Sequence, residues 1–173
     1  MESVGYEMYT RLLEEAVKEL RGEEVMPTLE IQIDIKVSAY IPDEYIENTS
    51  QKIEVYQDIA NIENEEQISE ICDELIDRYG EMPDEMFNLL EIARIKTYAR
   101  KYKIMKISQI DDKIGFKFAD AEFVNGDNIS LLLDNFKRRI YISGEEAPFV
   151  TIKLENYGEK ETLKEILKFL KML

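Results

Sequence analysis

Histidine and tryptophan are absent from the 173-residue sequence, and cysteine occurs once. Without histidine, the chain lacks the commonest general base and the commonest metal ligand. The single cysteine, Cys72, can form neither an internal disulfide nor a CxxC zinc motif, which fits a reducing, cytoplasmic setting. The seven glycines stand apart from one another, so no GxxxxGK[ST] or GxGxxG phosphate loop is present. The sequence therefore predicts a non-enzymatic domain without a cofactor or a metal.

Basic residues are also scarce, because 22 Lys and Arg face 37 Asp and Glu, for a net charge of −15 spread along the chain. Nucleic-acid binding depends on cationic contacts with phosphates, so this charge argues against direct contact with DNA or RNA. No stretch approaches the roughly 18 consecutive apolar residues of a membrane helix. The first three residues, Met-Glu-Ser, do not resemble a signal peptide. We expect no membrane partner.

The first part of the chain is predicted to be rich in helices. Apolar residues recur at helical spacing over 6–21, and alternation with period two over 29–37 predicts a half-buried strand. Capping-box patterns at Asn48 and Asn64 open two further helices, and Pro83 suits the first turn of a longer one that ends near residue 102. The expected inward residues are Ile53, Tyr56, Ile59 and Ala60 in the first capped helix, and Ile68, Ile71, Cys72, Leu75, Ile76 and Tyr79 in the second.

The second part is predicted to contain strands. Residues 104–110 and 114–118 indicate a hairpin, residues 127–137 a helix, 139–142 and 149–154 a second strand pair, and the chain ends in a helix from about residue 161. The fold class is therefore α+β, a mixed α/β arrangement. We expect a single two-lobed domain over 1–173, with a helix-rich lobe to about residue 102. The lobe over 103–173 is expected to hold a small, mostly antiparallel sheet with helices.

Two pairs of neighbouring carboxylates are candidates for acid–base chemistry, Asp43 with Glu44 and Asp111 with Asp112. Both pairs lie at predicted turns, where Asp is common because its side chain bonds to the nearby backbone. Turn formation is the favoured interpretation. Cys72 lies on the apolar face of its helix and has no histidine to activate it, so we interpret it as a buried structural thiol.

The helix predicted at 65–79 carries a polar cluster opposite its apolar stripe. Glu74, Asp77 and Arg78 have the i, i+3, i+4 spacing that places side chains on one face of a helix. Such a cluster is commonly a solvated face, and exposed ion pairs stabilise little. Arginine is, however, enriched at protein interfaces, where its fixed fork of donors is useful. Spacing alone leaves both interpretations open.

Several segments together resemble the C-terminal domain of bacterial transcription-repair coupling factors. The segments are VGYEMY (4–9), LLEEA (12–16), IPDEYI (41–46), ELIDRYG (74–80) followed by a proline at 83, and NLLEIAR (88–94). The resemblance covers most of residues 4–107 and thins afterwards. Its most distinctive part is the run over 74–94.

The resemblance implies that the chain is a regulatory part of a longer ATP-driven DNA translocase. That factor removes stalled RNA polymerase and recruits UvrA through a module homologous to UvrB. The C-terminal domain is implied to dock on this UvrB-like module and to restrain the factor. The family's acidic and arginine cluster falls on Glu74, Asp77 and Arg78, which favours a docking contact over a solvated face.

Two other functions remain open on sequence grounds. An acidic nucleic-acid mimic would need a contiguous acidic stripe, and the Lys and Arg residues along the chain do not suggest one. A metal-dependent hydrolase would need carboxylates that converge in a pocket. The leading prediction is a non-catalytic domain that binds proteins.

Overall fold

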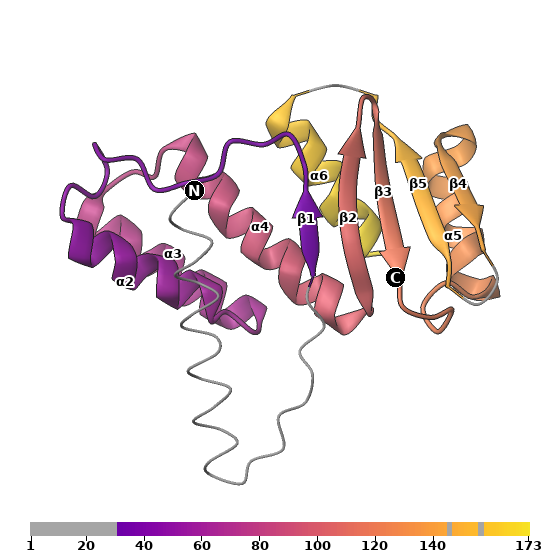
Figure 1. Ribbon diagram of the computed structural model, residues 1–173, viewed down its shortest axis with the longest axis horizontal. Coiled ribbons are helices and arrows are strands. Elements are labelled where there is room, and N and C mark those ends of the chain that lie inside the picture. Colours follow the sequence, from indigo (N-terminus) through magenta and orange to yellow (C-terminus); the bar gives the residue numbers. More distant parts are fainter. Residues whose placement is uncertain (1–30, 145–146, 156–157) are drawn as a thin grey trace, which may run out of the picture. The chain divides into compact units, whose positions relative to one another are not determined.

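Figure 1 shows the computed structural model, which describes residues 31–144, 147–155 and 158–173. The helix predicted over 6–21 and the first residues of the predicted strand over 29–37 lie outside these ranges. The elements in chain order are β1 (Gln32–Asp34), α2 (Thr49–Ala60), α3 (Glu65–Tyr79), α4 (Asp84–Lys101), β2 (Ile104–Ile110), β3 (Lys113–Phe118), α5 (Gly126–Phe136), the 3-10 turn η1 (Lys137–Arg139), β4 (Ile140–Ser143), β5 (Phe149–Lys153) and α6 (Glu159–Leu170).

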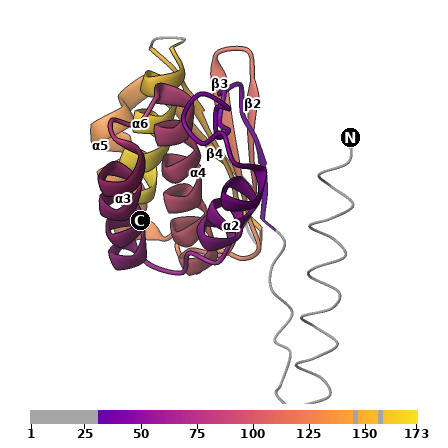
Figure 2. The same ribbon diagram turned by 90° about the vertical axis from the view of Figure 1, so that its left-hand side faces the viewer.

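The five strands form one mixed sheet in the order β1-β2-β3-β5-β4. β1 runs parallel to β2, whereas all other neighbouring strands are antiparallel. Helices α4, α6 and α5 cover one face of the sheet, and α2 and α3 pack beside α4 (Figures 1 and 2). This arrangement confirms the predicted α+β class. It also shows that the predicted strand near residue 33 joins the edge of the sheet formed by the second part of the chain.

Local sequence signals set most helix ends. The Asn48 side chain accepts a hydrogen bond from the backbone of Gln51, and Asn64 accepts one from Gln67, so both predicted caps are confirmed. Gly80 ends α3 with a φ of 84°, a left-handed conformation that glycine adopts at low cost. Pro83 is the N-cap residue of α4 and so precedes the first helical turn by one position.

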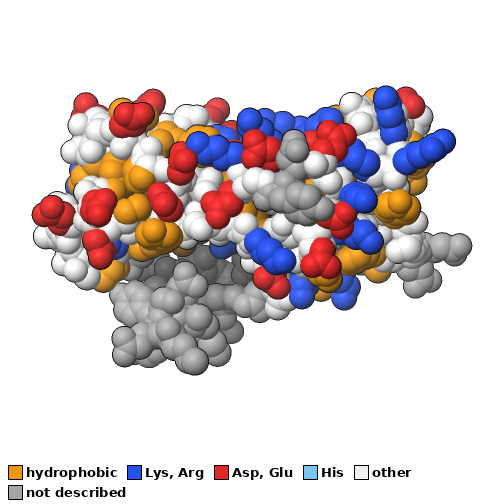
Figure 3. Space-filling view, turned by 90° about the horizontal axis from the view of Figure 1, so that it is seen from above, with side chains coloured by type: hydrophobic (Ala, Val, Ile, Leu, Met, Phe, Trp, Pro, Cys, Tyr) orange, Lys and Arg blue, Asp and Glu red, His pale blue; other side chains and the backbone are white. Residues whose placement is uncertain are grey.

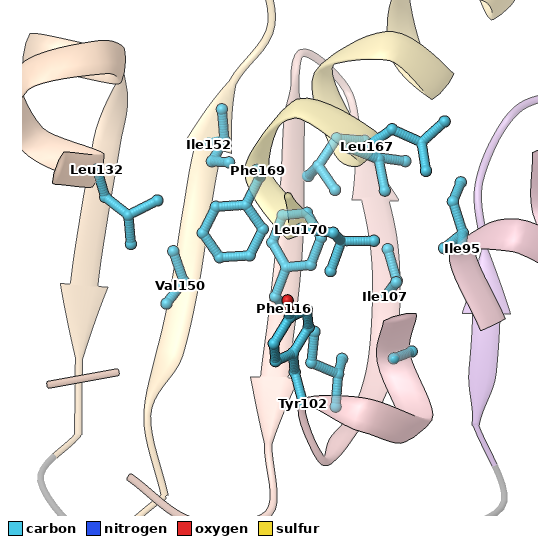
Figure 4. Packing of buried hydrophobic residues seen from close by; sticks show 14 of the residues in the cluster. Ile95, Tyr102, Ile107, Phe116, Leu132, Val150, Ile152, Leu167, Phe169 and Leu170 are labelled. Carbon is cyan, nitrogen blue, oxygen red and sulfur yellow. The ribbon is translucent and has the colours of Figure 1, made fainter. Parts of the chain in front are cut away.

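One apolar core lies between the sheet and its helices. Ile107, Phe116 and Val150 point from the strands toward this core and are fully buried. Phe169 of α6 packs against them, with its ring centroid 4.3 Å from that of Phe116 (Figure 4). Burial of large aromatic and aliphatic side chains is the dominant favourable contribution to folding. The predicted hairpin around Asp111 and the strand pair that follows are both confirmed.

A second apolar cluster holds α2 and α3 against the first half of α4. Its buried members are Ile41, Ile46, Val55, Ile59, Ile62, Ile68, Leu75, Met86, Leu90 and Ala93. Ile95 and Ala99, further along α4, belong to the core under the sheet. One helix therefore contributes to both clusters. The division into two lobes near residue 102 stays a prediction.

The predicted facing of two helices needs correction at their edges. Ile76 was expected inward but is 50% exposed; in α2, Ile53 is 43% exposed and Ala60 is exposed as well. In α2 the buried positions are Val55 and Ile59, whereas Tyr56 is 38% exposed and its hydroxyl oxygen accepts a hydrogen bond from the Ile41 N–H. Both isoleucines lie where the apolar stripe of a helix meets its solvent side. Residue type alone does not decide the orientation of such border positions.

Candidate functional site

The C-terminal half of α3 presents the polar cluster predicted from the sequence. Glu74, Asp77 and Arg78 are all exposed and share one side of the helix. Arg78 Nη1 donates to Glu74 Oε1 at 2.8 Å, and this hydrogen bond raises the pKa of the arginine above its ordinary value. The side chains of Arg78 and Glu74 retain 41% and 59% of their exposure. The pair is therefore formed in water and remains accessible to a partner.

Aromatic contacts hold the end of α3 in place beneath this cluster. The Arg78 guanidinium lies 5.2 Å from the centre of the Tyr79 ring, within the range of a cation–π contact. The Tyr79 and Tyr45 rings are 5.7 Å apart, and the Tyr45 hydroxyl donates to the carbonyl oxygens of Leu75 and Gly80. The last turn of the helix is therefore fixed from two sides. A fixed arginine loses less side-chain entropy when it binds.

Asp77 differs from Glu74 and Arg78 because these two form an ion pair with each other. It is exposed, and within the described part of the chain no ion pair involves it. Among residues 31–144, 147–155 and 158–173, none donates a hydrogen bond to its carboxylate, whereas the Glu74 carboxylate is already bonded to Arg78. The cluster therefore offers a free carboxylate beside a positioned arginine.

The neighbouring helix adds two acids that sequence reasoning missed. Partial burial first, and then the nearby charges of Glu54 and Glu74, raise the pKa of Asp58 in α2, whereas Arg78 acts in the opposite direction. Glu54 and Asp58 therefore extend the cluster across α2. The sequence contains part of the information needed to find them, because the short connection between α2 and α3 predicts that the two helices pack side by side in antiparallel orientation. Their rotation about their axes could not be predicted that way.

The other candidate residues do not converge on a site. Asp43 pairs with Lys52 in a turn, and Asp112 pairs with Lys153 at 3.3 Å. Burial raises the pKa of the half-buried Cys72 thiol, so its reactive thiolate is disfavoured. Among the residues that the structure describes, no group of Cys, Asp and Glu could hold a metal ion. Within the same residues, no helix has the length and apolar character needed to cross a bilayer.

The net charge of −15 is distributed unevenly along the chain. Residues 41–94 contain 3 Lys and Arg against 16 Asp and Glu, whereas residues 95–173 contain 15 against 12. On the face shown in Figure 3, Lys and Arg lie mainly over the half of the molecule that contains the sheet, and they are nearly absent from the end that carries α2 and α3. The cluster on α3 thus lies in a strongly acidic region that attracts a basic surface.

Comparison with known proteins assigns the family. The model of the TRCF domain matches residues 35–129, more than half of the chain, including the α3 cluster. The chain belongs to the TRCF domain family. The transcription-repair-coupling factor of Bacillus subtilis is 32% identical over 179 residues, which cover all of this chain and 15% of that protein. The corresponding factor of Staphylococcus haemolyticus is 45% identical over 101 residues, which cover 57% of this chain and 9% of that protein.

A solved structure has the same fold as this chain and supports the family assignment. It is described as the crystal structure of the C-terminal domain of transcription-repair coupling factor, and it matches with a TM-score of 0.74 and 28% identity. The match covers 83% of this chain and 91% of that one. The chain therefore has the fold of that C-terminal domain and spans a small fraction of the length of its curated relatives.

Proposed function

We propose that this chain is a non-catalytic regulatory domain of a cytoplasmic transcription-repair coupling factor. It docks on the UvrB-homology module of the same factor through Glu74, Asp77 and Arg78, and it thereby restrains the factor until a partner displaces it. The proposal extends to the parent protein the activity that the name of its relatives describes, the coupling of transcription to repair. UvrA and RNA polymerase are then indirect partners of the domain.

The observation that carries the proposal is the geometry of the α3 cluster. Arg78 is positioned by Glu74 and by the Tyr79 ring, and Asp77 beside it has no ion-pair partner among the described residues. A pre-positioned arginine next to a free carboxylate suits a complementary surface that offers one carboxylate and at least one cation. The surrounding acids of α2 favour a docking surface that is basic on balance.

A tethered contact of this kind can be weak and still effective. A domain on a short flexible connection experiences an effective partner concentration near the millimolar range. An intrinsic dissociation constant of about 10 μM would then keep the domain docked about 99% of the time. Polar contacts of modest strength are sufficient for this. A competitor for the same surface could release the restraint.

The direct test is a binding measurement between this 173-residue chain and the separately expressed UvrB-like module of its own factor. We expect a micromolar dissociation constant by calorimetry, weakened at least tenfold by the triple change Glu74→Ala, Asp77→Ala and Arg78→Ala. Loss of interface charge pairs typically costs from a few tenths to a few kcal/mol, so this reduction lies within the expected range of about 1–3 kcal/mol.

A matched control is available on α5 and the η1 turn that follows it. Asp127, Asp134 and Arg138 are exposed, and their replacement by Ala removes the same two negative charges and one positive charge. This control should leave binding unchanged. Equal effects of the two triple variants would show that only net charge matters, and absence of binding by the unaltered chain would refute the proposal.

A second candidate is an acidic mimic that competes for a nucleic-acid-binding surface. The excess of 16 acids over 3 basic residues in 41–94 favours it. Its affinity would depend on the total acidic charge of α2, α3 and their connection. Replacing Glu63, Glu66 and Glu70 by Gln removes three net negative charges, against one for the triple Ala change, and should therefore weaken binding more than that change does. The docking proposal expects these three replacements to have less than a twofold effect.

A further inference from the structure

The sheet face opposite α4, α5 and α6 differs in composition from the rest of the described surface. The strand register places every second residue of each strand on this face, since their neighbours Ile107, Phe116 and Val150 point into the core. Across the sheet, one row consists of Gln32, Lys106, Lys117, Phe149 and Ser143, the next of Asp34, Ser108, Gly115, Thr151 and Tyr141, and a third of Ile110, Lys113 and Lys153. These three rows therefore contain four lysines and one acid, Asp34.

The lysines are arranged as two like-charged pairs. Lys106 lies directly opposite Lys117, and Lys113 lies directly opposite Lys153. Like charges in this position destabilise a sheet. Asp112 offsets the second pair through its 3.3 Å contact with Lys153, but the first pair has no ion-pair partner within the described residues. An anionic ligand would relieve the repulsion in both pairs.

Aromatic side chains lie on the same face between the lysines. Phe149 is 40% exposed, and its ring lies so close over Gly115 that a Cβ at that position would come within 2.6 Å of the Phe149 Cζ atom. Tyr141, in the same row as Gly115, is 59% exposed. Lys113 and Lys117 are four residues apart on β3, a separation of about 13–14 Å in a strand. Phe149 itself belongs to the first row, but its ring extends over Gly115 of the middle row and so lies between two positive positions.

We propose that this face binds single-stranded nucleic acid. Its phosphates would lie at the two lysine pairs, and a base would stack on Phe149. Sequence-tolerant binding of single strands combines cations that follow the backbone with aromatic rings on which bases stack, and sheets are an established platform for it. A five-stranded face is too wide to enter a duplex groove, which admits a helix or a two-stranded ribbon. An acidic polypeptide could use the lysines but would have no equivalent use for the exposed ring.

The net charge of −15 led to the opposite expectation, because it averages over regions of opposite character. Residues 95–173, which supply four of the five strands, carry an excess of basic residues, and the acids are concentrated in 41–94. At an ionic strength near 0.15 M, exposed charges further apart than about 8 Å are largely screened from each other. A phosphate at the sheet therefore experiences mainly the lysines beside it.

The test is fluorescence anisotropy with labelled oligo(dT) and oligo(U) of about 15 nucleotides, titrated with the 173-residue chain at 50 and 150 mM salt. We expect saturable binding at 50 mM salt that weakens at 150 mM. The double variant Lys106→Gln, Lys117→Gln should bind at least about fivefold more weakly. The slope of the logarithm of the binding constant against the logarithm of the salt concentration should also become less steep by about 1.4. Each phosphate contact on a single strand contributes about 0.7 to this slope. Phe149→Leu should weaken binding by about fivefold or more through lost stacking.

The control variant Lys164→Gln, Lys171→Gln removes the same charge from two exposed positions, one in α6 and one directly after it. This variant should bind as the unaltered chain does. Thermal unfolding of each variant shows whether it is folded. Absence of binding at 50 mM salt would overturn the proposal, as would equal losses in the control. If duplex DNA of the same length binds as tightly, the face belongs to another class of partner. The same conclusion follows if poly-glutamate competes equally and Phe149→Leu has no effect.

Discussion

Leu75 and Ile76 are adjacent in α3 but lie in opposite environments, because Leu75 is 3% exposed and Ile76 is 50% exposed. Leu75→Ala should lower the free energy of unfolding by about 2–4 kcal/mol, the usual cost of removing a buried aliphatic side chain. Ile76→Ala should lower it by no more than about 0.5 kcal/mol, as for other surface substitutions. Urea denaturation of both variants measures the difference, and similar losses would contradict this orientation of the helix.

Local signals predicted the elements of this fold well, because their causes lie within a few residues. The side chain of Asn48 caps a helix through a backbone group three positions on, and the hairpin around Asp111 depends on one turn. The pairing of β1 with β2 could not be predicted in this way. Alternation near Ile33 shows that the strand is half-buried, but it contains no information about a partner some seventy residues away.

The candidate site was predictable to a similar extent. Helical spacing placed Glu74, Asp77 and Arg78 on one exposed face, which the structure has, whereas their role in docking stays a prediction. The proximity of Asp58 depends on how α2 and α3 rotate against each other, and that follows from packing around residues such as Val55 and Leu75. The pair of Lys113 with Lys153 likewise depends on register between strands distant in sequence, whereas Lys106 and Lys117 face each other across the predicted hairpin.

The cap of α3 offers a second stability test. Asn64 accepts a hydrogen bond from the Gln67 N–H at 2.9 Å, which satisfies one of the unpaired donors in the first turn. Asn64→Ala should therefore lower the free energy of unfolding by about 1 kcal/mol. Asn64→Ser keeps an acceptor and should lose less than half of that amount. Equal losses in the two variants, measured by urea denaturation, would show that the hydrogen bond is not the cause.

Asp58 predicts a dependence on pH with a definite sign. Its pKa is raised in the folded protein, first by partial burial and then by Glu54 and Glu74, so the folded state binds a proton more readily than the unfolded state. Its contribution is therefore most favourable below the unfolded pKa and is lost as the pH rises through the folded pKa. Asp58→Asn should stabilise the fold at pH 7 by no more than about 0.5 kcal/mol after solvent screening. The gain should shrink toward pH 3, and thermal unfolding across this range would detect a gain that grows instead.

The last prediction concerns the parent factor and rests on the proposed docking of the α3 cluster. Replacing Glu74, Asp77 and Arg78 by Ala should leave this chain nearly as stable as before, since each exposed substitution typically shifts stability by no more than about 0.5 kcal/mol. In the full-length factor, a loss of roughly 3 kcal/mol of docking energy would change a domain that is about 99% docked into one that is mostly released. The factor should then bind UvrA more readily and hydrolyse ATP faster without polymerase. The matched change at Asp127, Asp134 and Arg138 should alter neither. If the triple Ala variant unfolds, the cluster is structural; if it folds but UvrA binding and the ATPase rate stay unchanged, the restraining contact lies elsewhere on the domain.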